Sequence, residues 1–234
     1  MNQTQAFHQR IDAALHNDQL RHNFRAALTG IMARRAEQFP DEDQLQALRE
    51  QARQVRANSL VGQPDLLERL EARLIANGIQ VHWAEGPEQA NAIIQGILAA
   101  AAAKTVVKGK SMVSEETGLN DYLERHGIEV IESDLGEYII QLAKEPPSHI
   151  VAPAIHKNRR EVAELFRQFH PEIPYTEDID ELTQSAREIL RGKFAHADAG
   201  ISGVNFAVAE TGTLCLVENE GNGRLSTTAP RLHI

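Results

Sequence analysis

The first 59 residues show apolar positions at helical spacing and no segment that alternates in the manner of a strand. Glutamine, arginine and alanine are frequent, and Phe39-Pro40-Asp41 predicts a break between two helical stretches. Apolar residues can form one packing stripe on these helices, while the residues between them face water. The stripe includes Ile11, Leu15, Phe24 and Leu28. We therefore expect residues 1–59 to form a helical arm that serves packing or oligomerisation.

After Gly62 the pattern changes to an alternation of helices and strands. Pro64 and Asp65 are typical of a helix start, and Asn77-Gly78 is typical of a left-handed helix end. Strands separated by helices predict a parallel sheet covered on both faces, so residues 60–234 are expected to form one α/β domain. The expected helices cover residues 64–77, 87–103, 136–144, 158–169 and 178–191, with one more before residue 128, and the expected strands cover residues 79–84, 105–107, 128–131 and 150–152.

Near the C-terminus the pattern predicts two short apolar strands joined by a tight turn. The strands are residues 204–208 and 214–217, and the turn is Glu210-Thr211-Gly212-Thr213. Residues 231–234 resemble the start of another strand, and the sequence stops there without a turn, cap or polar tail. An unpaired terminal strand would leave a sheet edge uncovered. We therefore expect the chain to be a fragment of a longer protein.

The composition favours a folded α/β protein and excludes several other classes. Of the 234 residues, 42% are hydrophobic and 24% are charged, which suffices for a sizeable core. The formal charge of -9, with acidic and basic residues mixed, argues against nucleic acid as a partner. The longest apolar run, residues 93–103, is far shorter than the roughly 20 residues that span a bilayer. Residues 1–10 lack the pattern of a secretory signal.

The cysteine and histidine content limits the redox and metal chemistry of the chain. The single Cys215 indicates a reducing compartment, and we expect a cytoplasmic protein. An iron–sulfur cluster needs several thiolates and a redox dithiol needs a pair, so no such centre is expected here. The ten histidines show no His-x-x-x-His spacing, and no metal site is expected. Cys215 should pack as a small hydrophobic residue, and Trp83, the only tryptophan, is expected in the core.

The segment after the strand at residues 105–107 is the first candidate for ligand binding. Gly109-Lys110-Ser111 resembles the end of a phosphate-binding P-loop, but that motif requires a glycine where this chain has Lys104. The segment nevertheless joins a strand to a helix, and open α/β sheets bind anionic ligands at such junctions. The alternative is a solvated turn in which Glu115 and Glu116 satisfy the helix N-terminus. The candidate ligand-binding residues here are Lys108, Lys110 and Ser111.

A glycine-rich segment near the C-terminus, Gly221-Asn222-Gly223, is interpreted as a flexible loop. It is not a dinucleotide fingerprint, because Ser226 stands where the third glycine would be and no helical pattern follows. In a loop of this kind Asn222 and Arg224 can approach a ligand. The alternative is a turn whose side chains only point to solvent.

Glu210 occupies a position that suits chemistry, at the end of an apolar strand and directly before the predicted turn. A carboxylate there can face the crevice of the sheet and act as a base or a nucleophile. The alternative is that it accepts hydrogen bonds from the turn amides and holds the hairpin. Glu218 and Glu220 are weaker candidates for the same roles.

His156-Lys157 begins a basic stretch that continues through Arg159 and Arg160 at another strand-to-helix junction. A helix N-terminus normally favours acidic residues. The stretch therefore indicates either a ligand site or contact with an acidic partner, and the alternative is that these long side chains simply reach water.

Five motifs of this chain resemble the lactate utilisation protein B family, in register and in the same order. They are KSMVSEE at residues 110–116, ESDLGEYIIQL at 132–142, PSHIVAPAIHK at 147–157, GVNFAVAETGT at 203–213 and NEGNGR at 219–224. The resemblance implies a LUD domain with a three-layer, Rossmann-like sheet similar to the sugar-phosphate isomerase and CoA-transferase superfamily. It also implies a role in oxidising L-lactate to pyruvate, with other lactate-utilisation subunits as partners in a cytoplasmic, three-protein system.

The resemblance also implies what this chain lacks. Full-length members of the family carry cysteine runs for 4Fe–4S clusters after the LUD domain, and this sequence has no such runs. The clusters are expected in a missing C-terminal region, and lactate oxidation is not expected from this chain alone. Enzymes of the CoA-transferase superfamily use a glutamate as nucleophile, which makes Glu210 the candidate for that role here, although fold similarity alone does not transfer chemistry.

Three hypotheses of function remain open at this point. The first is a subunit domain of a lactate-oxidising system, whose crevice binds a small anionic ligand or docks redox partner proteins. The second is a stand-alone enzyme acting on a sugar phosphate or an acyl-CoA, and it alone predicts turnover by the isolated chain. The third is an interaction module whose arm pairs subunits into a homo-oligomer. The predicted catalytic residue is Glu210, and the predicted ligand-binding residues are Lys108, Lys110, Ser111, His156, Lys157, Asn205, Thr211, Asn222 and Arg224.

Overall fold

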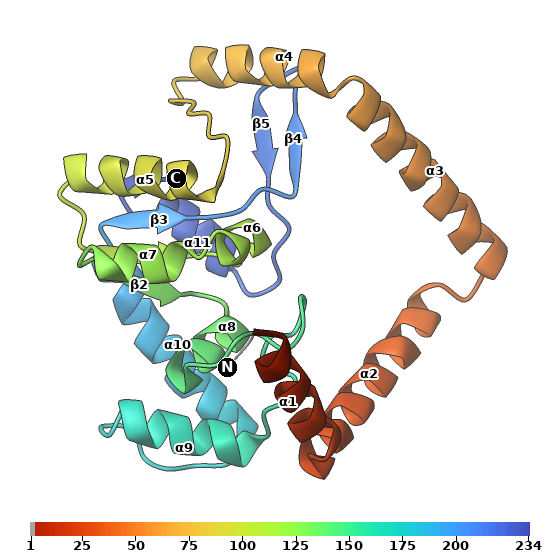
Figure 1. Ribbon diagram of the computed structural model, residues 1–234, viewed down its shortest axis with the longest axis vertical. Coiled ribbons are helices and arrows are strands. Elements are labelled where there is room, and N and C mark those ends of the chain that lie inside the picture. The colour runs from red at the N-terminus through yellow and green to blue at the C-terminus, as the bar shows by residue number, and fades with distance from the viewer. Residues whose placement is uncertain (1–2) are drawn as a thin grey trace.

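The N-terminal region forms a helical arm that begins beside an α/β domain, loops out from it and returns to it (Figure 1). The computed structural model describes residues 3–234. The arm consists of α1 (Gln3–Leu15), α2 (Asp18–Gln38) and α3 (Glu42–Val61). The break at Phe39-Pro40-Asp41 is confirmed, because Pro40 lacks an N–H and the Asp41 side chain accepts a hydrogen bond from the Gln44 amide at 3.0 Å to begin α3. No residue of α2 or α3 is buried.

A four-stranded parallel sheet lies at the centre of the domain. Its strands are β1 (Thr105–Lys108), β2 (Glu129–Glu132), β3 (Ala199–Ile201) and β6 (Leu232–His233), and their order is β2-β1-β3-β6. The register pairs Val106 with Val130 on one side and with Ala199 on the other. The predicted parallel sheet is confirmed, and the strand expected at residues 231–234 is present and paired with β3.

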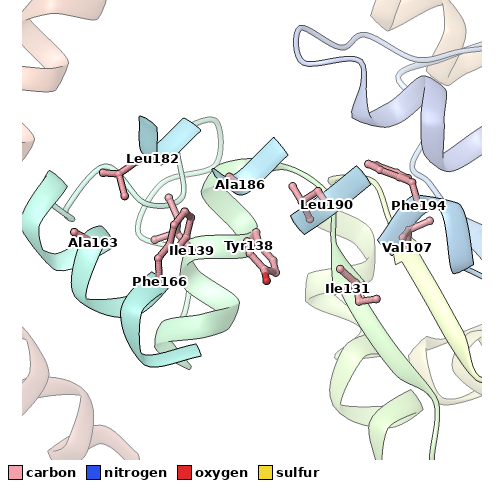
Figure 2. Packing of buried hydrophobic residues seen from close by; sticks show 10 residues of the cluster. All are labelled: Val107, Ile131, Tyr138, Ile139, Ala163, Phe166, Leu182, Ala186, Leu190 and Phe194. Carbon is pink, nitrogen blue, oxygen red and sulfur yellow. The ribbon is translucent and has the colours of Figure 1, made fainter. Parts of the chain in front are cut away.

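Helices cover both faces of this sheet, which makes the domain a three-layer, Rossmann-like α/β fold. Successive strand residues point to opposite faces. Val107 packs beside Phe194 of α10 (Ile179–His196), and the same buried cluster continues over β2 to α8 (Leu135–Ala143) and α9 (Arg159–Phe169), as Figure 2 shows. Val106 packs with α5 (Pro87–Ala100) and α7 (Leu119–Arg125) on the other face. Because β1 is buried on both faces, its sequence is a continuous apolar run up to Lys108.

Two helical features differ from the prediction. The helix expected before residue 128 is divided into α6 (Met112–Glu116) and α7, because Gly118 adopts a left-handed φ of 63° between them. The segment interpreted as a flexible loop instead starts α11 (Asn222–Thr228) after Gly221, whose φ is 79°. At seven residues, α11 is too short to show a helical period in the sequence.

Two predicted strands are wrong, and so is the core position of Trp83. Residues 79–84 form no strand, and Trp83 is 55% exposed, with its indole donating to Glu71 at 2.8 Å. Residues 150–152 form a bent loop, because side chains rather than a neighbouring strand satisfy their backbone. The His149 ring accepts from the Val151 and Ala152 amides at 3.1 Å each.

The predicted hairpin is confirmed as a separate two-stranded antiparallel sheet of β4 (Phe206–Val208) and β5 (Thr213–Cys215). Its turn lies against the end of α4 (Gln63–Ala76), where the Asn77 amide group donates to the Thr211 carbonyl at 3.0 Å. Cys215 is half-buried in β5. Within residues 3–234, no helix combines the length and the apolar character needed to cross a membrane.

Candidate functional site

A cavity of about 720 Å³ lies at the carboxyl edge of the parallel sheet. Its floor comes from residues that directly follow β1, β2 and β3, and its sides come from the loop at residues 150–155 and the segment at residues 216–223. Open α/β sheets bind their ligands at this edge. The polar lining consists of Lys110, Asp134, Ser202, Asn205, Glu218, Asn219, Glu220 and Asn222.

The three carboxylates of this lining all hold the N-termini of helices. Asp134 accepts from the Glu137 amide at 3.1 Å, and Glu220 accepts from the Leu135 amide at 3.2 Å, both at the start of α8. Glu218 accepts from the Arg224 amide in the first turn of α11 at 2.8 Å. Helix N-termini stabilise negative charge. The acidic side chains of the cavity are therefore engaged in holding its helices in place.

Lys110 is the positively charged group of the cavity: among the described residues that line it, no other lysine or arginine occurs. Its ammonium donates to the Val151 carbonyl at 3.1 Å and lies 3.4 Å from the Glu137 carboxylate. The side chain lines the cavity and is 24% exposed. Lys110 can bind an anion that enters the cavity.

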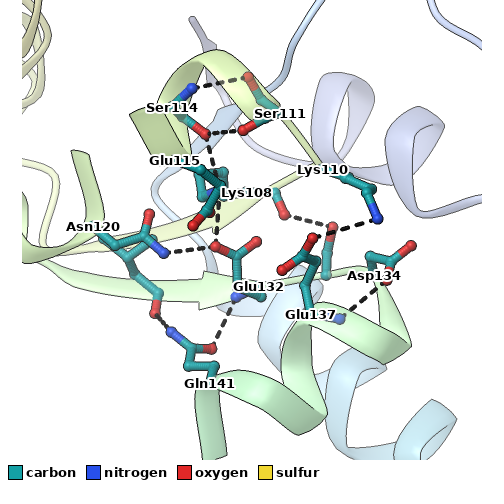
Figure 3. Close-up of polar contacts among 12 residues, drawn as sticks. Lys108, Lys110, Ser111, Ser114, Glu115, Asn120, Glu132, Asp134, Glu137 and Gln141 are labelled. Atoms are coloured by element: carbon teal, nitrogen blue, oxygen red, sulfur yellow. Dashed lines mark hydrogen bonds and ion pairs between the residues drawn. The ribbon is translucent and has the colours of Figure 1, made fainter. Parts of the chain in front are cut away.

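Glu137 lies beneath Lys110 in the first turn of α8, as Figure 3 shows. Its side chain is 6% exposed. Burial raises the pKa of Glu137, the nearby carboxylates of Glu132 and Glu115 raise it further, and Lys110 offsets only part of this. Glu137 thus binds a proton more tightly than an exposed glutamate does, beside the one cationic group found among the described residues of the cavity.

Lys108 lies outside the cavity, in a buried polar network on the other side of β1 (Figure 3). It is 1% exposed, and its ammonium lies 2.8 Å from Glu132 and 3.2 Å from Glu115 and donates to the Ser114 hydroxyl at 3.0 Å. Burial alone would lower the pKa of Lys108, but the two carboxylates outweigh burial and raise it. The ammonium stays charged, and these partners use its donors, so none is left for a ligand.

Of the other predicted residues near the cavity, Asn205 and Asn222 line it, whereas Ser111 and Arg224 do not. The side-chain Oδ1 of Asn205 accepts from the Val217 amide at 2.8 Å. Ser111 caps α6 by accepting from the Ser114 amide at 3.3 Å, a role that had been considered for Glu115 and Glu116. Arg224 lies on the exposed side of α11 and contacts Glu218 at 3.3 Å.

His156 and Lys157 converge on a single carboxylate behind the loop at residues 150–155. The His156 Nε2 atom lies 2.8 Å and the Lys157 ammonium 2.6 Å from Glu145. The His156 Nδ1 atom also lies 2.6 Å from the Ser148 hydroxyl. The two basic side chains therefore hold both ends of the loop together, and neither of them lines the cavity.

The structure separates Glu210 and Thr211 from the cavity. The hairpin carries both to α4, where the Glu210 carboxylate lies 3.4 Å from Arg69 and is 64% exposed. Thr211 turns its hydroxyl to Thr213 at 2.8 Å. The catalytic role predicted for Glu210 remains a prediction, and the geometry places it apart from Lys110, Asn205 and Asn222, which the structure does bring together.

Comparison with known proteins identifies the domain that contains this cavity. The LUD domain family matches residues 67–234. This chain belongs to the LUD domain family. Its sequence is 42% identical to lactate utilization protein B of Bacillus licheniformis over 234 residues, 40% identical to that of Bacillus subtilis over 232 and 41% identical to that of Bacillus pumilus over 232. The alignments cover 98–99% of this chain and 48% of each relative, so the chain spans about half their length. No solved structure matches it.

The LUD domain holds the entire cavity, while α1, α2 and α3 precede the matched residues. The residues of this domain do not fit an iron–sulfur cluster, because Cys215 is its single thiol and such a cluster is held by several. No group of three or more histidine, cysteine, aspartate or glutamate side chains within the described chain is placed to hold a metal ion.

The sequence interpretation missed Asp134, which lines the LUD domain cavity, and Glu137, which contacts Lys110. Their spacing was a usable signal, because an aspartate followed three residues later by a glutamate before an apolar run is typical of a helix start. The loop at residues 150–155 was missed as a cavity side because its apolar run was interpreted as a strand.

Proposed function

We propose that this LUD domain serves lactate utilisation by binding a small carboxylate in the cavity at the carboxyl edge of its sheet. The observation that carries the proposal is the Lys110 ammonium, which is partly exposed in a cavity whose own carboxylates are engaged by helix N-termini. The name of its relatives, lactate utilization protein B, supports lactate or pyruvate as the ligand. Both molecules carry a carboxylate that an ammonium binds by a charge-assisted hydrogen bond.

The polar groups around Lys110 suit the rest of such a ligand. Asn205, Asn222 and Ser202 supply amide and hydroxyl groups on the same lining, and these can bond a hydroxyl or keto oxygen. Ile139, Val151 and Pro153 supply apolar surface beside them. The volume of the cavity lies within the range of small-molecule sites, about 300–1,000 Å³.

The redox step of lactate oxidation is proposed to lie outside this chain. Removing two electrons from lactate requires an acceptor, and the LUD domain described above has neither a cysteine set nor a metal-ligand group for one. In this proposal the chain is the ligand-binding part of a cytoplasmic protein that works with other lactate-utilisation subunits, and 4Fe–4S clusters belong to those parts of the system. The chain alone then binds its ligand without turnover.

Thermal unfolding with and without ligand tests the proposal. L-lactate or pyruvate at one hundred times its Kd is expected to stabilise the chain by about 2.7 kcal/mol. Lys110→Gln should abolish this shift because it removes the ammonium, while Lys104→Gln, at an exposed lysine outside the cavity, should retain it. An equal shift in both variants would contradict the proposal. A shift with sugar phosphates or CoA esters alone would favour the stand-alone enzyme instead.

The affinity for this carboxylate is expected to rise as the pH falls. A bound anion competes with Glu137 for the Lys110 ammonium and adds negative charge beside Glu137. Both effects raise the pKa of Glu137 further, beyond the rise that burial causes. Binding therefore takes up a proton, and the affinity changes by at most about tenfold per pH unit above the pKa of the free protein.

Calorimetric titrations from about pH 5 to pH 8 in buffers of different ionisation enthalpy measure this proton uptake. Glu137→Gln should bind with an affinity that does not depend on pH over this range, because the titrating group is absent. A pH dependence that persists unchanged in Glu137→Gln would assign the proton to another carboxylate, for which Glu220 is the obvious candidate because burial also raises its pKa.

A further inference from the structure

The third helix of the arm leaves most of its apolar residues exposed, and Leu45 near its start is half-buried. In Figure 1, α3 lies on the outer side of the molecule, away from the sheet. No residue of α3 is buried, and Leu48 and Val55 are 48% and 65% exposed. The helix also precedes the residues that match the LUD domain and does not line the cavity. Ligand binding in the cavity therefore does not explain this stripe of apolar residues.

The spacing of the stripe is that of a coiled coil. Leu45, Leu48, Ala52, Val55 and Ser59 follow one another at alternating intervals of three and four residues. This spacing fills the a and d positions of a heptad, which form a seam for one partner helix. A helix that packs on a globular core normally has a wider apolar face.

The seam is complementary to a second copy of itself in the antiparallel direction. A two-fold axis near Glu50 places Leu45 opposite Val55 of the second copy and Leu48 opposite its Ala52. Each pair of facing side chains is one layer of the seam, and the two-fold symmetry repeats both layers. A large residue thus meets a smaller one in each layer. The helix of 20 residues is long enough to contain all four layers.

The charged residues beside the seam distinguish the antiparallel from the parallel direction. In the antiparallel pair, Glu42 lies opposite Arg56 of the second copy, and the two-fold repeats this contact. In the parallel pair, Gln44 and Gln51 would face the arginines at positions 49 and 56 of the second copy, and no opposite charges would meet. Within residues 3–234, Arg56 forms no ion pair, so its charge is available to a partner.

We propose that α3 pairs with α3 of a second copy of this chain, and that this antiparallel, two-fold contact makes the protein a homodimer. The seam is short and contains Ala52 and Ser59, so the dimer dissociates on dilution. Arg49 lies opposite Arg49 of the second copy across the axis, and the repulsion between these like charges weakens the dimer. The contact leaves the LUD domain cavity of each copy accessible.

Cysteine cross-linking tests the position of the axis. Gln51 lies at an edge of the seam where it faces Gln51 of the second copy, and Ala47 lies on the outer side of the helix. In a Cys215→Ser background, Gln51→Cys should form a disulfide-linked dimer under mild oxidation, and Ala47→Cys should stay monomeric under denaturing electrophoresis. Equal cross-linking at both positions, or none at Gln51→Cys, would overturn the proposal.

A charge exchange tests the direction and the partner independently. Light scattering over a range of concentrations should show a dimer whose dissociation constant rises about tenfold in Arg56→Glu, because two attractive contacts become repulsive. The double variant Glu42→Arg/Arg56→Glu should restore the original value, and Arg49→Gln should lower it. All these positions are exposed, so circular dichroism should show unchanged folding. A monomer at every concentration, or a dimer that Arg56→Glu leaves unchanged, would refute the α3 contact.

Discussion

Gly200→Ala is expected to separate α11 from the central sheet and to lower the free energy of unfolding by at least about 3 kcal/mol. A Cβ atom at Gly200 would lie 1.8 Å from the carbonyl oxygen of Ser226 and 2.9 Å from its carbonyl carbon. Both atoms belong to the backbone of α11, so no change of rotamer relieves the overlap. The helix itself must move away from β3.

Urea unfolding of Gly200→Ala measures this cost, and Gly192→Ala provides the matched control. Gly192 lies in α10, and a Cβ atom there meets nothing within 4 Å, so alanine should stabilise that helix by about 0.5–1 kcal/mol. Gly200→Ala should also weaken ligand binding, because Asn222 and Gly223 of α11 line the cavity. A loss of stability below about 1 kcal/mol would contradict the close packing of α11 on β3.

Lys108→Met is expected to cost about 3–5 kcal/mol of folding stability at neutral pH. The substitution keeps an unbranched apolar side chain, one atom shorter than lysine, but leaves Glu132, 3% exposed, without its cationic partner at 2.8 Å. Glu132 then retains only the Asn120 amide, which donates to it at 2.6 Å. An unpaired buried carboxylate is far more costly than either the intact pair or two neutral side chains.

The pH dependence of Lys108→Met separates this electrostatic cost from a packing defect. Burial without Lys108 raises the folded-state pKa of Glu132, so the folded variant binds a proton that the unfolded chain releases. Its stability should be greatest below the unfolded pKa and should fall as the pH rises toward the folded pKa. Lys108→Met/Glu132→Gln should recover much of the loss, whereas a loss independent of pH would contradict the buried pair.

The local pattern of the sequence predicted three of the four strands of the central sheet, β1, β2 and β6, and missed β3 at residues 199–201. The run of Val106 and Val107 is typical of a strand buried on both faces, and the pairing of β1 with β2 and β3 buries both of these residues. Residues 150–152 are likewise a continuous apolar run, and residues 79–84 alternate apolar with polar residues, yet neither segment forms a strand. Sheet formation depends on a free neighbouring edge, and a short apolar segment does not encode whether such an edge is available.

Among the predicted site residues, the structure brings together those whose place follows from the order of strands and helices, and it separates those whose place depends on the direction of a turn. Lys110, Asn205 and Asn222 follow strands or begin a helix, and the parallel sheet brings such junctions to one edge. Glu210 also ends a strand, but that strand belongs to the separate hairpin, whose turn lies on α4. The local sequence around Glu210 does not indicate whether its strand belongs to the central sheet or to a separate hairpin.

The sequence by itself determined the helical arm, the parallel α/β architecture and the edge of the sheet at which a ligand site is expected, because these follow from periodicity and from local helix and turn signals. Only the tertiary structure decided the roles of two lysines that lie two residues apart. Lys108 is buried with Glu132 and Glu115, and Lys110 faces the cavity beside Glu137. The physical reason is that an ammonium is buried or accessible according to the carboxylates that the folded chain brings close to it. The local sequence pattern does not specify which carboxylates these are.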